Sequence, residues 1–400
     1  MADYQETPNL FKPLQVGRMR VLTRVALAPL SRSRAPNHQV TALHTEYYSQ
    51  RASRAGTLLI TEAVFISAAA AGFTSSPGIY KQDHIEGWRQ VFSAIHAKRS
   101  FVFVQLWALG RAAVRDNLAA EGLPYVAPAL MPQDLAPENS ATAPRALTRG
   151  EIKQYVADWV QAAHNAIAAG ADGVEIHAAN GFLLDQFLHA NTNSRDDEYG
   201  GSIENRARIV LEVVDAVCAA VGADRVGIRI SPWGNFGDVD PGAGSPVAQW
   251  SYLLAELQRR ADAGHELAYV STVDIRDDAA AAPTTSGADE AAITSLQRDA
   301  RNRDFARLTW RGVLIRASGY NYERACHETA LDPRLVIAVG RLFIATPDLP
   351  DRWERKIPLN RYRRESFYTM GAVGYTDYPF ADELVARGDR DSETKTMASL

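Results

Sequence analysis

The segment EIHAANGFLLDQF, residues 175–187, begins as a β-strand and ends as a different kind of structure. It extends the apolar run GVEIHAA (173–179), which lacks the polar alternation of a half-exposed strand. Such a run is typical of a parallel strand that is covered on both faces. The run contains His177, and Asn180 and Phe182 follow it. This stretch alone leaves open whether His177 is a satisfied core histidine, with Phe182 as packing, or part of a functional site.

Seven further apolar runs are similar to residues 173–179, and segments with helix signals separate them. Together they predict strands at RVALAPL (24–30), TLLITEAV (57–64), FVFVQLW (101–107), GVEIHAA (173–179), VGIRISP (226–232), LAYVSTV (267–273), GVLIRASG (312–319) and LVIAVGRLF (335–343). Thr148 with Glu151 forms a capping box before one intervening helix, and Ser202 with Glu204 opens another. This alternation predicts an α/β fold, a (β/α)8 TIM barrel in which residues 1–400 form a single domain. Residues 10–24 are expected to form an N-terminal β-hairpin around Gly17 that caps the bottom of the barrel.

Active sites of such barrels lie at the C-terminal ends of the strands. The residues expected there are Ser31, Glu62, Gln105, Trp107, His177, Asn180, Arg229, Ser318, Gly319, Gly340 and Arg341. Most of them offer hydrogen bonds rather than acid groups. The turn at Ser318 and Gly319 and the pair Gly340–Arg341 belong to strands seven and eight, where barrels bind phosphate. Each feature has a purely structural alternative, but together they predict a ligand that carries a phosphate.

The composition narrows the possible partners. The formal net charge is −4, and the densest basic run, RYRR at 361–364, is short, which argues against nucleic acid as the main partner. No apolar run approaches transmembrane length, and the N-terminus lacks the pattern of a signal peptide. We therefore expect no membrane association and a cytoplasmic location, in which Cys218 and Cys326 are reduced thiols.

Other chemistries receive less support. Only Glu175 and His177 share a strand face, and there is no HExxH or CxxC motif, so we expect no metal site. The chain has no GxSxG motif for a hydrolase nucleophile, and no predicted strand contains the lysine of a Schiff-base aldolase. Two alternatives stay open from the residues alone: a lyase or hydrolase that uses His177 as its base, and a barrel that only binds a ligand.

Eight segments carry a resemblance that covers nearly the whole chain. They are ALAPLSRSRA (26–35), FVFVQLWALGRAA (101–113), DGVEIHAANGFLLDQFL (172–188), DEYGGSIENRAR (197–208), VGIRISP (226–232), AVGRLFIATPDLP (338–350), PLNRY (358–362) and GYTDYP (374–379). In this order they resemble the old yellow enzyme family of FMN-dependent ene reductases. The set is far more specific than any single motif in it.

The resemblance implies a cofactor, FMN, with NADPH or NADH as its reductant, and a small α,β-unsaturated carbonyl substrate. It implies an FMN site at Pro29, Leu30, Ser31, Ala63, Gln105, Arg229, Ser318, Gly319, Gly340 and Arg341. Within this set, Ser31 and Gln105 would bond the flavin ring, Arg229 would stabilise its reduced anionic form, and Gly319, Gly340 and Arg341 would hold the phosphate. His177 and Asn180 would donate hydrogen bonds to the substrate carbonyl oxygen, so that the β-carbon accepts hydride. Trp107 and Tyr375 would form walls of the substrate pocket.

Phe182 departs from the family pattern. Many family reductases have Tyr at this position, and its hydroxyl protonates the α-carbon after hydride transfer. Phe182 has no proton to donate, so protonation should be slow unless water or another residue supplies it. In the fungal alkaloid branch, Phe here accompanies redox-neutral isomerisation of an enal. The sequence therefore indicates a fungal-type member of secondary metabolism that reduces an enal or enone, with isomerisation as the alternative.

Other departures concern the cofactor site and one loop. Ser31 stands where the family often has Thr or Cys, and Ala63 and Ser318 replace glycines. Residues 277–303 form an alanine-rich, polar segment after the sixth strand, longer than is usual in the family. We expect a mobile insertion on the catalytic face, either a lid over a bulky substrate or a solvated loop without a role. The resemblance leaves a monomer and a homodimer equally open.

Overall fold

Eight parallel strands close into a barrel in the computed structural model, which describes residues 7–130, 143–240, 246–274 and 304–384. Around the barrel the strand order is β4, β3, β13, β12, β11, β10, β9 and β6, and pairing of β6 with β4 closes the ring. The strands are β3 (Val25–Leu27), β4 (Leu58–Ile60), β6 (Phe101–Trp107), β9 (Gly173–Ala178), β10 (Val226–Ile230), β11 (Tyr269–Val273), β12 (Leu314–Ala317) and β13 (Leu335–Val339). All eight predicted strands are present, and the (β/α)8 barrel is confirmed.

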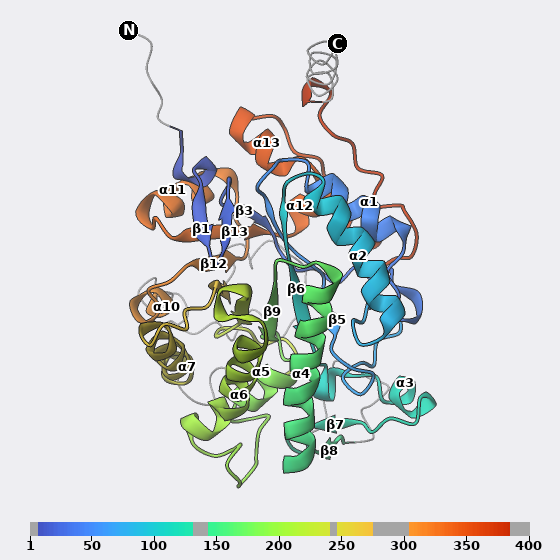
Figure 1. The fold of residues 1–400 in the computed structure, drawn as a ribbon, viewed down its shortest axis with the longest axis vertical. Helices are drawn as coiled ribbons and strands as arrows, with labels where there is room; N and C mark the ends of the chain where they lie inside the picture. Colours follow the sequence, from blue (N-terminus) through green and yellow to red (C-terminus); the bar gives the residue numbers. More distant parts are fainter. Residues whose placement is uncertain (1–6, 131–142, 241–245, 275–303, 385–400) are drawn as a thin grey trace.

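Helices cover the outside of the barrel, where α4 and α6 lie side by side against β9 (Figure 1). The helices are α1 (Ala42–Arg51), α2 (Gln82–His96), α3 (Arg115–Ala120), α4 (Arg149–Ala169), α5 (Leu183–Leu188), α6 (Ile203–Val221), α7 (Pro246–Asp262), α10 (Phe305–Thr309), α11 (Tyr322–Leu331), α12 (Arg341–Ala345) and α13 (Leu349–Arg355). The predicted capping box begins α4. The Thr148 side chain accepts a hydrogen bond from the Glu151 N–H, and the Glu151 carboxylate accepts one from the Thr148 N–H. Among the described residues, no helix is long and apolar enough to span a membrane.

The predicted N-terminal hairpin closes the lower end of the barrel. Its strands are β1 (Leu14–Val16) and β2 (Met19–Val21), which pair antiparallel. Their apolar side chains join one buried cluster with the lower interior of the barrel: Val16, Met19, Val21, Ala26, Leu58, Phe103, Tyr269, Ile315 and Val336. At the turn, Gly17 has φ 52°, and a Cβ there would lie 2.0 Å from the Asp224 carbonyl oxygen. The turn therefore requires glycine in order to seat against the barrel.

Smaller elements complete the fold. Short strand β5 (Val64–Phe65) pairs with the end of β6, and β7 (Val126–Ala127) pairs with β8 (Arg145–Ala146). The 3₁₀ turns are η1 (Asn9–Phe11), η2 (Pro36–His38), η3 (Gly110–Ala112), η5 (Ala223–Arg225) and η8 (Arg364–Ser366).

Several predicted strands end earlier than expected, and those over 24–30 and 57–64 end at Leu27 and Ile60. The strand expected over 335–343 ends at Val339, because the chain turns at Gly340 and begins helix α12. The strand expected over 312–319 ends at Ala317, because Ser318 and Gly319 have φ of 139° and 64° and leave the extended conformation. The predicted insertion at 277–303 lies outside the described residues.

Candidate active site

A layer of buried polar side chains crosses the barrel above its apolar floor. Gln105 and Glu175 are register partners on β6 and β9, and the Gln105 amide donates to the Glu175 carboxylate at 2.6 Å. Burial raises the pKa of Glu175, and the positive charge of Arg229, inward-facing on β10, opposes that shift. Tyr269 of β11 lies beside the same carboxylate. These groups form a charge-balanced platform inside the barrel.

His177 lies one inward position above Glu175 on β9, and it pairs in register with Arg229 of β10. Burial, reinforced by the charge of Arg229, lowers the pKa of His177 well below its ordinary value. The imidazole is therefore neutral near pH 7 and carries one N–H donor. Its Nδ1 has no hydrogen-bond partner among the described residues.

Aromatic rings enclose His177. The Trp107 ring lies nearly parallel to the His177 ring at a centroid distance of 6.3 Å, and Phe65 stacks on the other side of Trp107 at 5.0 Å. Phe182 meets both Trp107 and His177 edge to face, at 4.7 and 5.2 Å. The half-exposed Phe236 lies 6.2 Å from Phe182. The structure thus brings Trp107, His177 and Phe182 together, as the sequence predicts.

Asn180 lies in the turn that follows β9. It has φ 57°, a left-handed conformation that is uncommon outside glycine, and its N–H donates to the Ser231 hydroxyl at 2.7 Å. Ser231 directly follows β10, so a neighbouring strand holds this turn. Sequence reasoning assigned no role to Ser231, although its place at the end of a predicted strand was a usable signal.

The ends of β12, β13 and β3 meet on the other side of the barrel mouth. Leu30 contacts Gly340 so closely that a Cβ on this glycine would lie 3.3 Å from the leucine side chain. The Arg341 guanidinium lies 5.7 Å from the centre of the Tyr362 ring. Ser318 has φ 139°, a region that favours glycine, so its replacement of a family glycine strains the backbone at this turn.

The segment after β3, which includes Ser31, contacts the buried carboxylate of Glu62. Glu62 accepts a hydrogen bond from the Arg32 N–H at 3.4 Å, and its Oε1 lies 3.6 Å from His44 Nε2. Burial raises the pKa of Glu62 to about 7 and lowers that of His44 to about 4. Ala63 is buried next to it and packs in the cluster that contains Trp107.

Tyr375, which the sequence suggests as a wall of the substrate pocket, packs beneath the segment 31–34. Tyr375 is fully buried, and its ring stacks on Tyr47 at 4.2 Å and meets His44 edge to face at 5.8 Å. The guanidinium of Arg34 covers it at 4.6 Å. These contacts hold the ring, while its hydroxyl is buried without a hydrogen-bond partner among the described residues, and its role as a pocket wall stays a prediction.

The residues at the barrel mouth fit FMN. Nε of Arg229, Nδ1 of His177 and Nε1 of Trp107 are buried and lack hydrogen-bond partners among the described residues. Buried polar atoms of this kind are normally bonded, so Arg229 suits the polar edge of a flavin ring, and His177 and Trp107 leave polar groups for a substrate beside it. The left-handed Gly319, φ 64°, exposes backbone near the position expected for a phosphate.

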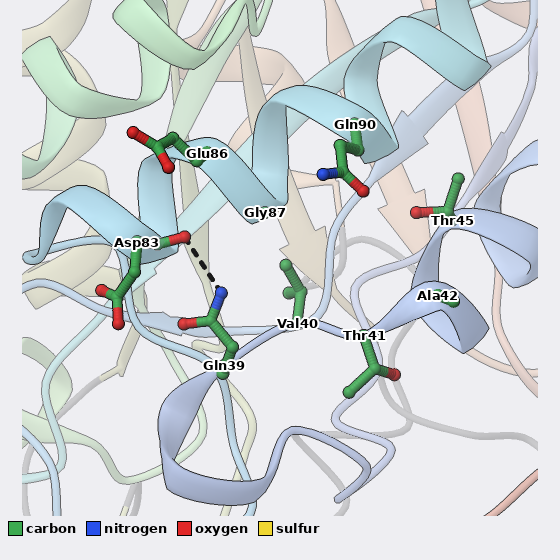
Figure 2. Close-up of a pocket in the computed structure, with 9 residues that line it drawn as sticks. All are labelled: Gln39, Val40, Thr41, Ala42, Thr45, Asp83, Glu86, Gly87 and Gln90. Carbon is green, nitrogen blue, oxygen red and sulfur yellow. Dashed lines mark hydrogen bonds between the residues drawn. The ribbon is translucent and has the colours of Figure 1, made fainter.

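A second hollow lies on the outer surface between α2 and the segment before α1. Figure 2 shows Gln39 Nε2 donating across it to the Asp83 carbonyl oxygen, at 2.9 Å. Its lining consists of Gln39, Val40, Thr41, Ala42, Thr45, Asp83, Glu86, Gly87 and Gln90. None of these is a predicted site residue, and the described part of the chain places no cluster of three metal-ligating side chains there or elsewhere.

Comparisons with known proteins identify the family. Residues 9–360 match the family model described as the NADH:flavin oxidoreductase / NADH oxidase family. The chain is 45% identical to Enoate reductase 1 of Kluyveromyces lactis, over 95% of this chain and 96% of that protein. It is 44% identical to Chanoclavine-I aldehyde reductase fgaOx3 of Penicillium roqueforti, over 94% and 97%.

A solved structure shares the fold as well as the sequence. The crystal structure of Old Yellow Enzyme from a Pichia species superposes with a TM-score of 0.84 at 37% identity, and the match covers 94% of both chains. The barrel, the residues at its mouth and these matches agree with the resemblance seen in the sequence. The chain belongs to the NADH:flavin oxidoreductase / NADH oxidase family and is an FMN-dependent oxidoreductase of the old yellow enzyme type.

Proposed function

We propose that this enzyme passes hydride from NADPH or NADH, through FMN, to the β-carbon of an α,β-unsaturated aldehyde or ketone. The observation that carries the proposal is neutral His177 at the C-terminal end of β9, beside Trp107 and level with Arg229, with Asn180 in the turn that follows. The relatives named as an enoate reductase and an aldehyde reductase support a conjugated carbonyl substrate, and their fungal sources support a role in secondary metabolism.

The site residues form two groups, those that would contact the substrate and those that would contact the cofactor. His177 and Asn180 would donate hydrogen bonds to the carbonyl oxygen, where negative charge grows as hydride reaches the β-carbon. FMN, when bound, supplies that hydride. Arg229 would hold a positive charge beside the pyrimidine end of the ring, with Gln105 and Ser31 as hydrogen-bonding neighbours. Pro29, Leu30 and Ala63 would provide apolar contacts, and Trp107 would form a wall of the substrate pocket.

Phe182 favours a second candidate, redox-neutral isomerisation of an enal or enone. Its ring lies against both Trp107 and His177 but offers no proton for the α-carbon. An isomerase would not need a proton at the α-carbon, because it returns the hydride to the flavin and forms no saturated product. Net reduction with water as the proton source remains our first proposal, since the named relatives are reductases.

The cofactor and the reaction can be tested together on purified protein. We expect a yellow protein that releases FMN on denaturation, and that consumes NADPH or NADH in proportion to product with a panel of enals and enones. A colourless protein that fails to take up added FMN would contradict the proposal. A yellow protein that forms product without stoichiometric consumption of the nicotinamide would favour isomerisation.

A phosphate-binding role for Arg341 predicts a specific loss. Arg341→Ala should weaken FMN binding by about 1.5–3 kcal/mol, the range for hydrogen bonds to charged groups, while the FMN-saturated variant keeps most of its activity. The measurement is the Kd of FMN for the apoprotein. Arg311→Ala is the matched control, because Arg311 is exposed and pairs with Asp262 at the lower end of the barrel. Equal FMN affinity in both variants would rule out the assignment.

We further propose that the enzyme acts in the cytoplasm on a small molecule, as a monomer or homodimer. The free thiols Cys218 and Cys326 are compatible with a reducing compartment.

A further inference from the structure

Asp185 is a fully buried carboxylate with no assigned role. It lies in the first turn of the short helix α5, directly after the turn that carries Asn180. Its Oδ2 accepts hydrogen bonds from the Gly181 N–H at 2.8 Å and from the Ser231 hydroxyl at 3.4 Å. Its Oδ1 lies 3.5 Å from His189 Nε2. Burying a carboxylate costs free energy unless hydrogen bonds or a charged partner compensate it. The partners of Asp185 therefore indicate what it stabilises.

The contacts of Asp185 converge on the turn 180–181. Ser231, which donates to Asp185, accepts the hydrogen bond from the Asn180 N–H at 2.7 Å. Both N–H groups of the turn are therefore linked to Asp185. The Gly181 N–H donates to it directly, and the Asn180 N–H reaches it through the Ser231 hydroxyl, a link that we call the relay. A single carboxylate oxygen thus holds two successive backbone groups.

This turn needs such support. Asn180 and Gly181 are consecutive left-handed residues, with φ of 57° and 70°. Asparagine adopts this sparsely populated conformation more readily than other non-glycine residues, and contacts with the surroundings stabilise it further. The turn also packs tightly, since a Cβ on Gly181 would lie 2.1 Å from the Phe236 carbonyl oxygen. The relay therefore favours the backbone conformation that orients the Asn180 side chain.

The next residue of α5 holds the turn from its other side. Gln186 donates from Nε2 to the Gly181 carbonyl oxygen at 2.8 Å and to the Leu109 carbonyl oxygen at 2.9 Å. It also accepts from the Arg111 N–H at 3.2 Å. The turn after β9 is therefore tied to the loop that follows Trp107. The N–H groups of the turn are therefore linked to Asp185, and the Gly181 carbonyl oxygen accepts from Gln186.

We propose that Asp185 is a positioning residue that acts through Ser231 to hold Asn180 in the conformation that binds the substrate carbonyl. The inference rests on the proposed function, because it assumes that Asn180 is a carbonyl donor. Asp185 and Ser231 do not act on substrate themselves. They determine the orientation of a group that does, and so set affinity for carbonyl and phenolate ligands without contributing to FMN binding.

The test measures binding of 4-hydroxybenzaldehyde to the FMN-loaded enzyme by calorimetry, because its phenolate oxygen can accept the same two hydrogen bonds. Ser231→Ala should weaken binding about five- to tenfold, since it leaves the half-buried Asn180 N–H without its acceptor. Asp185→Leu should weaken it at least as much. Asp185→Asn should bind within about twofold of wild type, because its amide oxygen can accept both bonds of Oδ2.

A double-mutant cycle separates positioning from general damage. In an Asn180→Ala background, Ser231→Ala should change the affinity by less than about twofold, since the group that it positions is gone. Ser100→Ala is the matched control: Ser100 is a buried serine before β6, at the opposite end of the barrel, that bonds the Ala52 and Arg54 carbonyl oxygens. It should leave the affinity unchanged. FMN content reports the folded state of every variant.

The outcomes distinguish the two levels of the proposal. If Asn180→Ala alone leaves the affinity unchanged, the carbonyl-donor role fails, and the relay fails with it. If Asn180→Ala weakens binding but Ser231→Ala does not, the donor role stands and the relay is wrong. If Ser231→Ala weakens binding equally in both backgrounds, its effect does not pass through Asn180, and the relay is again overturned. Should Asp185→Leu fail to fold, Ser231→Ala decides alone.

Discussion

Replacing His177 and Asn180 together by alanine is expected to slow hydride transfer to an enone by at least about 10²–10³-fold, the loss typical of one oxyanion donor. In the proposed function both donors would face the oxygen on which negative charge develops, and the neutral state of His177 leaves its N–H available throughout the neutral pH range. FMN should stay bound, because neither residue belongs to the proposed phosphate site at Gly340 and Arg341.

The measurement is rapid mixing of the reduced enzyme with an enone such as 2-cyclohexenone, together with the affinity for 4-hydroxybenzaldehyde. The double variant should lose both rate and affinity, and each single variant should lose part. FMN content serves as the control for folding. If the double variant keeps its affinity and its rate, His177 and Asn180 do not bind the carbonyl. The result would then favour the alternative that His177 is a core histidine.

Phe182→Tyr is expected to accelerate the reaction of reduced enzyme with an enone by about 10²–10⁴-fold, the usual range for general acid catalysis. The Phe182 ring already lies 5.2 Å from the His177 ring and 4.7 Å from the Trp107 ring, so the variant places a hydroxyl on a ring beside both proposed pocket residues. Reduction of the enzyme by NADPH or NADH needs no proton at the substrate α-carbon, and its rate should not change.

The same variant distinguishes a reductase from an isomerase. An isomerase should convert substrate with NADPH or NADH needed only to prime it, whereas Phe182→Tyr should consume the nicotinamide stoichiometrically and shift products toward saturated compounds. Phe236→Tyr is the matched control, since Phe236 lies 6.2 Å from Phe182 but is more than half exposed. If Phe182→Tyr leaves the enone step and the products as in wild type, position 182 is not the protonation site. The isomerase proposal would then lose its main support.

The sequence by itself determined the barrel and the identity of most residues at its mouth. A parallel strand that is buried on both faces must be apolar throughout, so each strand is visible as a local run, as in residues 101–107 and 226–230. The capping box at Thr148 and Glu151 is equally local, because its two partners lie within one turn. His177, Asn180 and Phe182 could be placed at one strand end because they follow one another along the chain.

Only the tertiary structure decided contacts between distant segments. Tyr375 is seated in the core by Tyr47 and Arg34, which lie more than 300 residues earlier in the chain, so its sequence neighbourhood gave no sign of that position. The hydrogen bond from Gln105 to Glu175 depends on the register between β6 and β9. The relay from Asn180 through Ser231 to Asp185 joins the ends of two neighbouring strands and a helix. Such links depend on strand order and register, which are set by packing of the whole barrel rather than by any local preference of the chain.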